Sequence, residues 1–473
     1  MSPALSALAR EHLDRVRAFY DAAPITPQAG ARAYRALLAH YYNLLIPPGA
    51  SVLEIGCGAG ELLALLRAGK KTGVDLSPTQ LAAARARVPD ADFFAQPGEL
   101  LDLGGRRFDV IILSDTLNLA ADVQHLLAGL HAVAHADTRL LLNFQNSLWR
   151  PLLSLACALG LKSREPQNSW LASSDVLNLL RLADWTAVRR EGRVLVPFAA
   201  LGLGSLVNRW LAPLLQWFCL TVFLVARPAR AAARELTVSV VIPARNEAGN
   251  IAAAVARTPD MGAGTELIFV EGHSRDETWA EIQRVAAANP SRKIKILQQT
   301  GRGKGDAVRA GFAVATGDVL MILDADLTMP PEELPKFYEL LASGRAEFAN
   351  GVRLVYPMDE KAMQFLNLCA NKAFGLIFTW LLGQPVKDTL CGTKVLTRAH
   401  YEKIAAGRAY FGDFDPFGDF DLLFGAAKLN LAIADVPIRY RERTYGTTNI
   451  QRWKHGWLLL RMVLFAARKL KFV

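Results

Sequence analysis

Two aspartates separated by one residue have the spacing in this sequence that most directly indicates chemistry. Asp324 and Asp326 follow the apolar run Val319-Leu-Met-Ile-Leu323. Such a run is typical of a strand buried on both faces of a parallel sheet. Because residues i and i+2 of an extended chain point to the same side, both carboxylates should project together from the end of this strand. Two carboxylates at the carboxyl end of a central strand suit Mg²⁺ or Mn²⁺ bound together with the phosphates of a ligand.

An isolated Asp-x-Asp pair is a weak signal, because short motifs occur by chance and the pair also fits a solvated strand end. The surroundings strengthen the metal interpretation. Gly301-Arg-Gly-Lys-Gly305 lies upstream, where the glycines let the backbone approach a diphosphate and Arg302 and Lys304 complement its charge. This is not a Walker loop, because Lys304 is followed by Gly305 and not by Ser or Thr. Downstream, Pro330-Pro-Glu-Glu333 has the proline and acids typical of a first helical turn.

Acidic and amide side chains follow two further predicted strands. Val238-Ser-Val-Val-Ile-Pro243 is one of them, and Asn246 and Glu247 come soon after it. Glu266-Leu-Ile-Phe-Val-Glu271 is the second, and more acids follow it. Ligands of open α/β sheets bind at the carboxyl ends of the strands. We therefore expect Asn246 and Glu247 to meet the base or the ribose of a nucleotide.

A second group of chemically informative residues lies in the first half of the chain. In Ser51-Val-Leu-Glu-Ile-Gly-Cys-Gly-Ala-Gly60 a buried strand that contains Glu54 runs into a glycine-rich turn. Glycines of this kind let a backbone turn tightly and approach a ligand. They are Gly56, Gly58 and Gly60. Lys71-Thr-Gly-Val-Asp75 predicts a second strand, and its final acid suits a ribose diol. The glycine-rich turn alone is weak evidence, because nicotinamide dinucleotide sites share it.

The elements that position these residues divide the chain into two α/β halves. In the first half, helices over 1–45 precede strands expected at 52–55, 71–75, 108–114, 140–143, 185–196 and 218–225. In the second half, strands are expected at 238–243, 266–271, 295–299 and 319–323. Residues 227–235 are small, charged and poor in large apolar side chains, which is typical of a linker. We therefore expect domains at 1–228 and 236–473 with a linker at 229–235.

Composition agrees with two globular domains. The chain has 473 residues, which is too many for one ordinary core, and its hydrophobic content of 52% argues against a disordered chain. The five cysteines include no Cys-x-x-Cys pair, which favours a reducing compartment and argues against a disulfide scaffold or a zinc site. Charged residues stand among the first fifteen, where a signal peptide would need an apolar core. These features predict a cytoplasmic protein.

The net charge of +10 is concentrated toward the C-terminus. Residues 457–471 mix apolar bulk with a basic end, and this segment is too short and too charged to span a bilayer. It suits an interfacial helix on an anionic membrane surface, which we expect to be the inner face of the membrane. A helix that closes its domain and keeps a solvated basic face is the alternative. Nucleic acid is disfavoured as a partner, because the charge lies beside apolar bulk and no recognition motif is present.

The first half resembles the class I S-adenosylmethionine-dependent methyltransferases over residues 30–228, most specifically in Val52-Leu-Glu-Ile-Gly-Cys-Gly-Ala-Gly60. The resemblance implies that Glu54 and the three glycines line the methionine end of the cofactor and that Asp75 takes its ribose hydroxyls. Ser114-Asp115 ends the fourth strand, near where the reacting methyl group should lie. A purely structural role is the alternative for Asp115.

The second half resembles the family 2 glycosyltransferases of the GT-A fold over residues 236–455. Three motifs, in this order, most resemble the dolichyl-phosphate glucosyltransferase and mannose synthase group. They are Gly303-Lys-Gly-Asp-Ala-Val308, Asp324-Ala-Asp326 and Asp388-Thr-Leu-Cys-Gly-Thr-Lys394. The resemblance implies that Asp324 and Asp326 hold the metal on the diphosphate and that Glu271 reads the base. It further implies roles in bordering the nucleotide, contacting phosphate or approaching the acceptor for Pro243, Arg245, Glu247, Lys304, Arg443 and Asp421.

The sequence thus predicts an α/β protein with an N-terminal Rossmann-like methyltransferase sheet and a C-terminal GT-A nucleotide-sugar-binding domain. We expect a bifunctional enzyme that uses Mg²⁺ or Mn²⁺ to transfer a sugar, predicted to be UDP-linked, to a polyprenyl phosphate or another lipid-linked acceptor. S-adenosylmethionine-dependent methylation would serve the same cell-envelope glycan pathway. The alternatives are glycosylation of a soluble acceptor and a membrane-associated scaffold whose first half binds cofactor without turnover. The sugar, both acceptors and the oligomeric state stay open.

Overall fold

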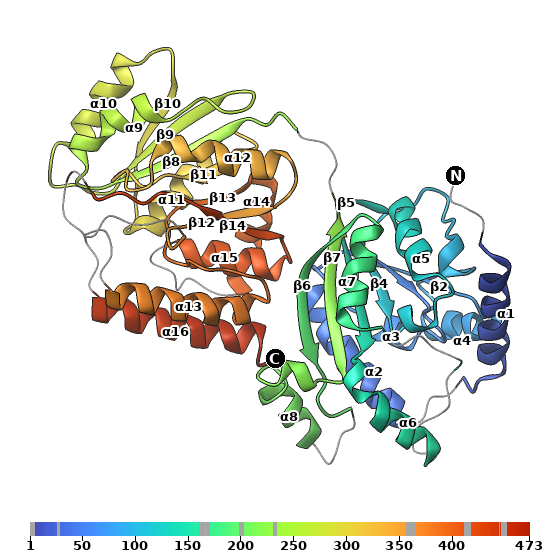
Figure 1. Cartoon of the computed structure of the whole chain (residues 1–473). Coiled ribbons are helices and arrows are strands. Elements are labelled where there is room, and N and C mark those ends of the chain that lie inside the picture. The colour runs from blue at the N-terminus through green and yellow to red at the C-terminus, as the bar shows by residue number, and fades with distance from the viewer. Residues whose placement is uncertain are drawn as a thin grey trace. The chain divides into compact units, whose positions relative to one another are not determined.

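Two seven-stranded sheets, one in each half of the described chain, form the framework of the computed structural model (Figure 1). They belong to two compact units, Met1–Ala229 and Arg230–Lys471. The structure describes residues 5–25, 29–159, 166, 171–197, 203–229, 234–355, 365–410, 418–443, 445 and 452–473, and for residues 29, 365–370, 419 and 452–456 it describes the backbone alone. Helices accompany both sheets, and the predicted α/β class is confirmed.

The sheet of the first unit has the strand order β3-β2-β1-β4-β5-β7-β6. Neighbouring strands from β3 to β5 run parallel, whereas β7 runs antiparallel to both β5 and β6. Because β7 enters from the opposite end, its first residue, Thr221, pairs with Gln145 at the carboxyl end of β5. The strands are β1 (Ser51–Ile55), β2 (Lys70–Asp75), β3 (Asp92–Ala95), β4 (Phe108–Ser114), β5 (Ala134–Gln145), β6 (Trp185–Arg193) and β7 (Thr221–Pro228).

Apolar residues of the inner strands form the core of this unit. Leu53, Leu113 and Leu140 are fully buried, as continuous apolar runs in inner parallel strands predict. Helix α4 begins where the Ser77 hydroxyl accepts a hydrogen bond from the Gln80 amide, a cap that satisfies one free amide of the first turn. The helices are α1 (Ala7–Ala22), α2 (Ala29–Leu45), α3 (Glu61–Leu65), α4 (Pro78–Arg87), α5 (Val123–Gly129), α6 (Arg150–Ala158), α7 (Ser173–Leu182) and α8 (Leu203–Trp210).

The sheet of the second unit has the order β10-β9-β8-β11-β13-β12-β14. Strand β11 is fully buried, as predicted, but it has a parallel neighbour, β8, on one side and an antiparallel neighbour, β13, on the other. The predicted parallel environment is therefore correct for one neighbour only. The strands are β8 (Val238–Ala244), β9 (Thr265–Glu271), β10 (Lys293–Gln298), β11 (Val319–Ile322), β12 (Phe348–Val352), β13 (Lys394–Thr397) and β14 (Ile433–Pro437).

The aspartate pair follows β11 in a turn. The strand ends at Ile322, the Leu327 amide donates to the Asp324 carbonyl at 3.1 Å, and Leu327 has a φ of +53°. The extended continuation that the sequence predicts is therefore replaced by a turn. Beyond it, Pro331–Glu333 form a short 3-10 helix that leads into α12 (Leu334–Ala342), so the predicted helix start is confirmed.

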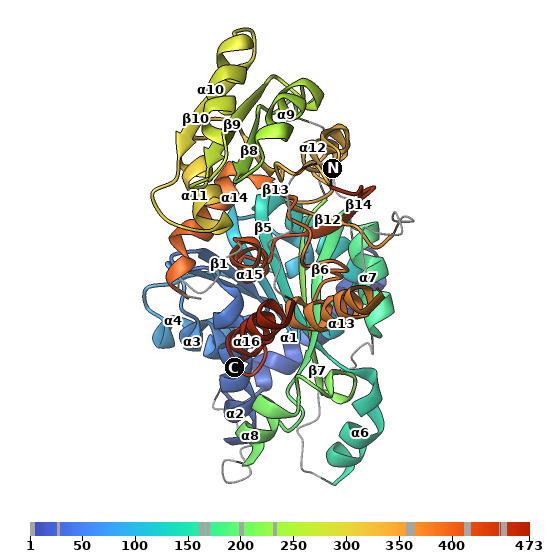
Figure 2. The ribbon, with the colours of Figure 1, turned by 90° about the vertical axis from the view of Figure 1, so that its left-hand side faces the viewer.

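Two long helices, α13 (Phe365–Leu382) and α16 (Arg452–Leu470), lie side by side in both views (Figures 1 and 2). Phe378 and Leu381 of α13 and Leu459 and Val463 of α16 are buried. None of the helices in the described ranges is long and apolar enough to cross a membrane. The other helices of this unit are α9 (Ile251–Arg257), α10 (Thr278–Ala288), α11 (Lys304–Val314), α14 (Arg398–Ala406) and α15 (Asp419–Lys428).

Candidate active sites

Lys304 and Asp324 form the first ion pair of the site in the second unit. Lys304 Nζ lies 2.6 Å from Asp324 Oδ1, and both side chains are partly exposed. Lys304 begins α11 directly after Gly303, whose φ of +87° is a conformation that glycine adopts easily. Gly392 lies against both side chains, and a Cβ at that position would overlap Asp324 Oδ2. The glycine loop therefore brings a lysine to the carboxylate, and Gly392 leaves the space beside it open.

Arg443 joins the second aspartate to an acid from another strand. Its Nη2 lies 2.7 Å from Asp326 Oδ2, and its Nη1 lies 2.7 Å from Glu247 Oε1. The other oxygen of Asp326 accepts from the amide and the hydroxyl of Thr328 at 3.1 and 2.8 Å. A guanidinium is planar and permanently charged, so contact on two sides fixes both carboxylates. The structure thus brings together three predicted site residues, because Arg443 contacts the carboxylates of both Asp326 and Glu247.

Glu247, which follows β8, and Glu271, the last residue of β9, have pKa values shifted in opposite directions. Burial raises the pKa of Glu247, although the Arg443 charge and the hydrogen bond from Asn250 oppose the rise. Burial also acts to raise the pKa of Glu271, but hydrogen bonds led by the Ser274 amide, 2.5 Å from Oε1, hold that pKa below its ordinary value. Glu271 therefore stays ionised and able to accept hydrogen bonds from a ligand.

The other predicted residues of this unit lie on separate elements. Pro243 lies within β8, and Arg245 follows the strand with an exposed side chain. Asp421 lies on α15, where its Oδ2 is 2.7 Å from Arg408 Nε, a different partner from those of Asp324 and Asp326. Because α15 is helical from its first residue, this segment is not the extended chain on which positions 419 and 421 would share a side.

A buried ion pair that the sequence interpretation missed positions the loop that carries Gly392. Arg353 Nε and Nη2 lie 2.7 and 2.9 Å from the two oxygens of Asp388, and Asn350 donates to the Asp388 carbonyl at 3.0 Å. Burial acts to raise the pKa of Asp388, but the Arg353 guanidinium outweighs it and holds that pKa below its ordinary value. The motif that begins at Asp388 is recognisable in the sequence, but no local pattern shows that Asp388 meets Arg353.

In the first unit, the predicted turn and the predicted acid are in direct contact. The three glycines after β1 all have positive φ, with values of +72°, +51° and +72° for Gly56, Gly58 and Gly60. Asp75, at the end of β2, accepts from the Gly58 amide at 2.7 Å and from the Ser77 amide at 2.9 Å. Burial raises the pKa of Asp75, and these hydrogen bonds oppose the rise. The turn is therefore held in a shape that requires glycine.

Glu54 is a buried acid with an unmet hydrogen-bonding group. It lies within β1 and is 1% exposed, and its Oε2 has no hydrogen-bond partner. Burial raises the pKa of Glu54 to about 8, although the charge of Arg35 opposes the rise. A buried polar atom without a partner is costly, so this oxygen favours a ligand that brings a donor or a positive charge.

Comparison with known proteins matches one segment in each half of the chain to a known family. Residues 52–137 match the family described as a methyltransferase domain, and residues 239–403 match glycosyl transferase family 2. The chain joins a methyltransferase domain to a family 2 glycosyltransferase domain. The first sheet therefore has the methyltransferase fold and the second the GT-A fold, as predicted, and the two domains indicate an enzyme.

The glycosyltransferase domain is related to dolichol-phosphate mannosyltransferases. The chain is 36% identical over 224 residues to the dolichol-phosphate mannosyltransferase of Pyrococcus furiosus, a match that covers 46% of this chain and 60% of that protein. It is 40% identical over 216 residues to an undecaprenyl-phosphate 4-deoxy-4-formamido-L-arabinose transferase of Pectobacterium carotovorum, with 45% and 62% covered. The chain thus spans less than two thirds of the length of either relative.

Solved structures show similarity to each domain at low sequence identity. Glucosyl-3-phosphoglycerate synthase of Mycobacterium tuberculosis, in complex with Mn²⁺ and UDP, is 20% identical over 50% of this chain and 80% of that one, with a TM-score of 0.36. An S-adenosylmethionine-dependent methyltransferase of Thermotoga maritima is 16% identical over 42% of this chain and 91% of that one, with a TM-score of 0.33.

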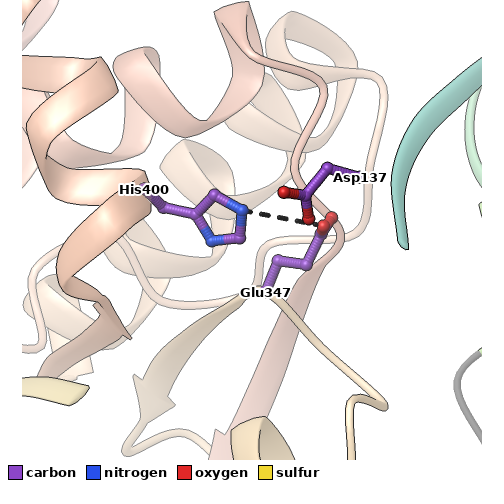
Figure 3. Close-up of side chains that lie close together, drawn as sticks. All are labelled: Asp137, Glu347 and His400. Atoms are coloured by element: carbon purple, nitrogen blue, oxygen red, sulfur yellow. Dashed lines mark ion pairs between the residues drawn. The ribbon is translucent and has the colours of Figure 1, made fainter. Parts of the chain in front are cut away.

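A further acid and histidine pair of the glycosyltransferase domain lies outside the site. His400 Nε2 is 3.8 Å from Glu347 Oε1, and Figure 3 marks this contact with a dashed line. The other atoms of both side chains are engaged locally, because Glu347 Oε2 accepts from the Ala432 amide at 2.9 Å and His400 Nδ1 shares a hydrogen bond with Thr397 Oγ1 at 2.9 Å. The pair therefore braces strand ends. Asp137, the third side chain in Figure 3, belongs to the methyltransferase domain.

Proposed function

We propose that the glycosyltransferase domain transfers a sugar from a UDP-linked donor to a polyprenyl phosphate or another lipid-linked acceptor. The observation that carries this proposal is that each aspartate of the Asp-x-Asp pair holds a basic side chain, Lys304 on Asp324 and Arg443 on Asp326. Such a site attracts positive charge to its carboxylates and offers basic groups to a diphosphate. The names of the two relatives, for dolichol-phosphate and undecaprenyl-phosphate transfer, support the class of acceptor.

Mg²⁺ or Mn²⁺ fits the residues present, because carboxylate oxygens are the hard ligands that these ions prefer. Both aspartates also pair with a positively charged side chain, Lys304 or Arg443, so their surroundings suit positive charge. A bound ion would stabilise the negative charge of the leaving diphosphate. When a metal ion takes their place on the aspartates, Lys304 and Arg443 would contact phosphate oxygens. An acceptor that is already a phosphate anion requires no strong base, so we assign catalysis mainly to charge stabilisation. In this proposal Glu247, Glu271 and the residues at the end of β8 border the nucleotide.

Helix α16 supports a peripheral position at an anionic membrane surface, which we place at the cytoplasmic face. One side of the helix is buried, and Val463, within the 457–471 segment expected at the membrane surface, belongs to that buried side. Lys471, at the basic end of this segment, is also buried, and its Nζ lies 5.8 Å from the centre of the Trp380 ring. The opposite side carries a stripe of apolar and basic residues at helical spacing. This exposed stripe is Trp457, Leu460, Arg461, Leu464 and Arg468.

We further propose that the methyltransferase domain binds S-adenosylmethionine and methylates a component of the same pathway, which we take to be a cell-envelope glycan. Asp75 fits the ribose hydroxyls of such a cofactor, and the Gly56–Gly60 turn lets the backbone lie close to it. The partnerless Oε2 of Glu54 fits its cationic methionine end. Bound there, the cofactor would supply the methyl group.

The experiment for the glycosyltransferase proposal has two stages. Thermal shift of the full chain with a set of nucleotide sugars, with and without Mn²⁺, first identifies the donor. Transfer from that donor to undecaprenyl phosphate in detergent is then compared between wild type, Asp326→Asn and the control Asp260→Asn, whose exposed carboxylate pairs with Arg292 at 3.2 Å. We expect Asp326→Asn to keep its fold and lose roughly 100-fold or more of the transfer rate.

The outcomes separate the proposal from its alternatives. Undiminished transfer by Asp326→Asn at low Mn²⁺ would contradict the metal assignment. Transfer to soluble acceptors alone would support glycosylation of a soluble acceptor. A folded chain that binds a nucleotide sugar but neither transfers nor hydrolyses it would support the scaffold alternative.

A further inference from the structure

A cluster of polar side chains lies on one face of the methyltransferase sheet, beyond the residues assigned to the cofactor. Asn143 and Gln145 are two positions apart on β5 and therefore share a face, and Thr221 pairs with Gln145. Asp115 directly follows β4, and its amide donates to the Asn143 carbonyl at 3.2 Å. Tyr34 of α2 reaches the same place, with its hydroxyl 3.0 Å from Thr221 Oγ1. The carboxyl ends of β4 and β5, the start of β7 and one helix thus contribute to a single cluster.

Two buried side chains hold Asp115 in place. Asn143 Nδ2 donates to Asp115 Oδ1 at 2.8 Å. Asn143 Oδ1 in turn accepts from the Tyr42 hydroxyl at 2.6 Å and from the Ser114 hydroxyl at 2.9 Å. Asn143 and Tyr42 are fully buried, whereas Asp115 and Tyr34 are only partly buried. The buried pair therefore orients the carboxylate, and the partly exposed pair stays within reach of a substrate.

Asp115 also lies directly beside the turn assigned to the cofactor. Its neighbour Thr116 donates from Oγ1 to the Ile55 carbonyl at 2.9 Å, and the Thr116 side chain lies against Gly56. Asp115 itself has a φ of +54°, which is uncommon for a residue other than glycine and persists only where the surroundings enforce it. The carboxylate is therefore held at a defined position next to the end of β1.

The cluster offers hydrogen-bond acceptors to a ligand. Gln145 Oε1 is buried and has no hydrogen-bond partner, and the Asp115 carboxylate only accepts. Burial raises the pKa of Tyr34, and the charge of Asp115 raises it further, so this phenol stays protonated. A ligand that completes the cluster must therefore bring donors, as the hydroxyl groups of a sugar do.

We propose that this cluster is the methyl-acceptor site, that it takes a hydroxyl-bearing acceptor of the sugar class, and that Asp115 is its general base. Tyr34 and Gln145 contact the acceptor, and Asn143 and Tyr42 are positioning residues. In the reaction the acceptor oxygen forms a bond to the methyl carbon, the carbon–sulfur bond breaks and leaves its electron pair on sulfur, and the hydroxyl proton passes to Asp115 and then to solvent. This inference rests on the proposed S-adenosylmethionine-dependent methylation.

The test uses the full chain and two readouts, one of which needs no acceptor. Calorimetry gives the affinities for S-adenosylmethionine and for the neutral S-adenosylhomocysteine. A carboxylate beside the cationic sulfur favours the former, so Asp115→Asn should reduce that preference by about tenfold, the effect of one opposite charge within ~6 Å. Asn accepts positive φ nearly as readily as Asp, so this variant should fold. Asp92→Asn, an exposed acid on β3 that pairs with Arg106, is the charge-matched control and should change neither affinity.

The second readout is transfer of a labelled methyl group to D-glucose, D-mannose and methyl α-D-glucoside, with ethanolamine as an amine probe. We expect transfer to at least one sugar, reduced roughly 100-fold or more in Asp115→Asn, the usual range for a general base. Tyr34→Phe should raise KM more than it lowers kcat. Transfer confined to the amine, or absent from every sugar, overturns the sugar assignment. An unchanged cofactor preference in Asp115→Asn overturns the placement of Asp115, whereas a wild type that binds neither cofactor overturns the proposed methyltransferase function itself.

Discussion

Removal of the Arg443 side chain should destabilise the glycosyltransferase domain when no metal ion is added and, at the same time, strengthen its binding of a bare metal ion. Arg443 makes two contacts of 2.7 Å, one to Asp326 and one to Glu247. In Arg443→Ala both carboxylates lose this counter-charge. A divalent ion that needs Asp326 then no longer has to displace a guanidinium.

The magnitude follows from the burial of the three groups. The side chains of Arg443, Asp326 and Glu247 are 27%, 16% and 9% exposed, so the interaction lies between a surface pair and a buried one. Surface pairs contribute about 0.2–1 kcal/mol and breaking a buried pair costs about 3–5 kcal/mol, so we expect the free energy of unfolding to fall by about 2 kcal/mol. If Mn²⁺ must displace this interaction, the same energy corresponds to up to roughly 30-fold tighter binding of Mn²⁺ alone.

The assay combines calorimetry with urea unfolding. Mn²⁺ alone should bind Arg443→Ala more tightly than wild type, whereas UDP in the presence of Mn²⁺ should bind it more weakly, because Arg443 is then missing from the phosphates. Saturating Mn²⁺ should recover most of the stability that the variant loses in a chelator. Arg441→Ala, which removes an exposed arginine two residues away, is the matched control and should leave both affinities unchanged. Equal Mn²⁺ affinity in wild type and Arg443→Ala would refute the idea that the arginine and the metal compete for Asp326.

Four further predictions concern the other parts of the molecule. The pKa of Glu54 is about 8 in the folded state and 4.5 ordinarily, so unfolding releases a proton at any pH between these values. The free energy of unfolding should therefore fall as pH rises from 4.5 to about 8. Glu54→Gln should flatten this pH dependence of the free energy of unfolding, measured in urea titrations. Binding of cationic S-adenosylmethionine should release the same proton, which calorimetry in buffers of different ionisation enthalpy detects. Fragments 1–230 and 236–473 should each fold, as circular dichroism and cooperative melting would show; failure of both would contradict the proposed boundary. Charge reversal at Arg461 and Arg468 should reduce flotation with anionic vesicles at low salt, since each basic residue contributes about 1 kcal/mol near such a surface, while nucleotide-sugar hydrolysis should persist. A wild type that ignores these vesicles would identify α16 as an ordinary packed helix.

Much of the framework was predictable, because it depends on local patterns. The apolar run before Asp324 had to be a buried strand, and β11 is fully buried. The glycines after β1 had to form a tight turn, and all three have positive φ. A run of apolar residues or a cluster of glycines restricts the backbone within a few residues, and such restrictions are readable without knowing what packs nearby.

The side-chain partners at the sites depend on contacts between distant parts of the chain. Arg443 lies 117 residues from Asp326 and 196 residues from Glu247 along the chain. Tyr42 reaches Asn143 across 101 residues. No local pattern specifies such pairs, because a charged side chain has many possible partners until the order of the strands decides which of them are neighbours.

The sequence by itself determined that the chain has two α/β halves, each with acids and glycines at the ends of predicted strands. Tertiary structure decided how those groups are used. Strand β13 lies antiparallel between β11 and β12, and the segment just before it in the chain brings Gly392 against Asp324. Strand β7 runs antiparallel to β5, which places Thr221 beside Gln145. The physical reason is that hydrophobic periodicity and turn chemistry act over a few residues, whereas ion pairs and hydrogen bonds depend on distances that only the packed sheet fixes.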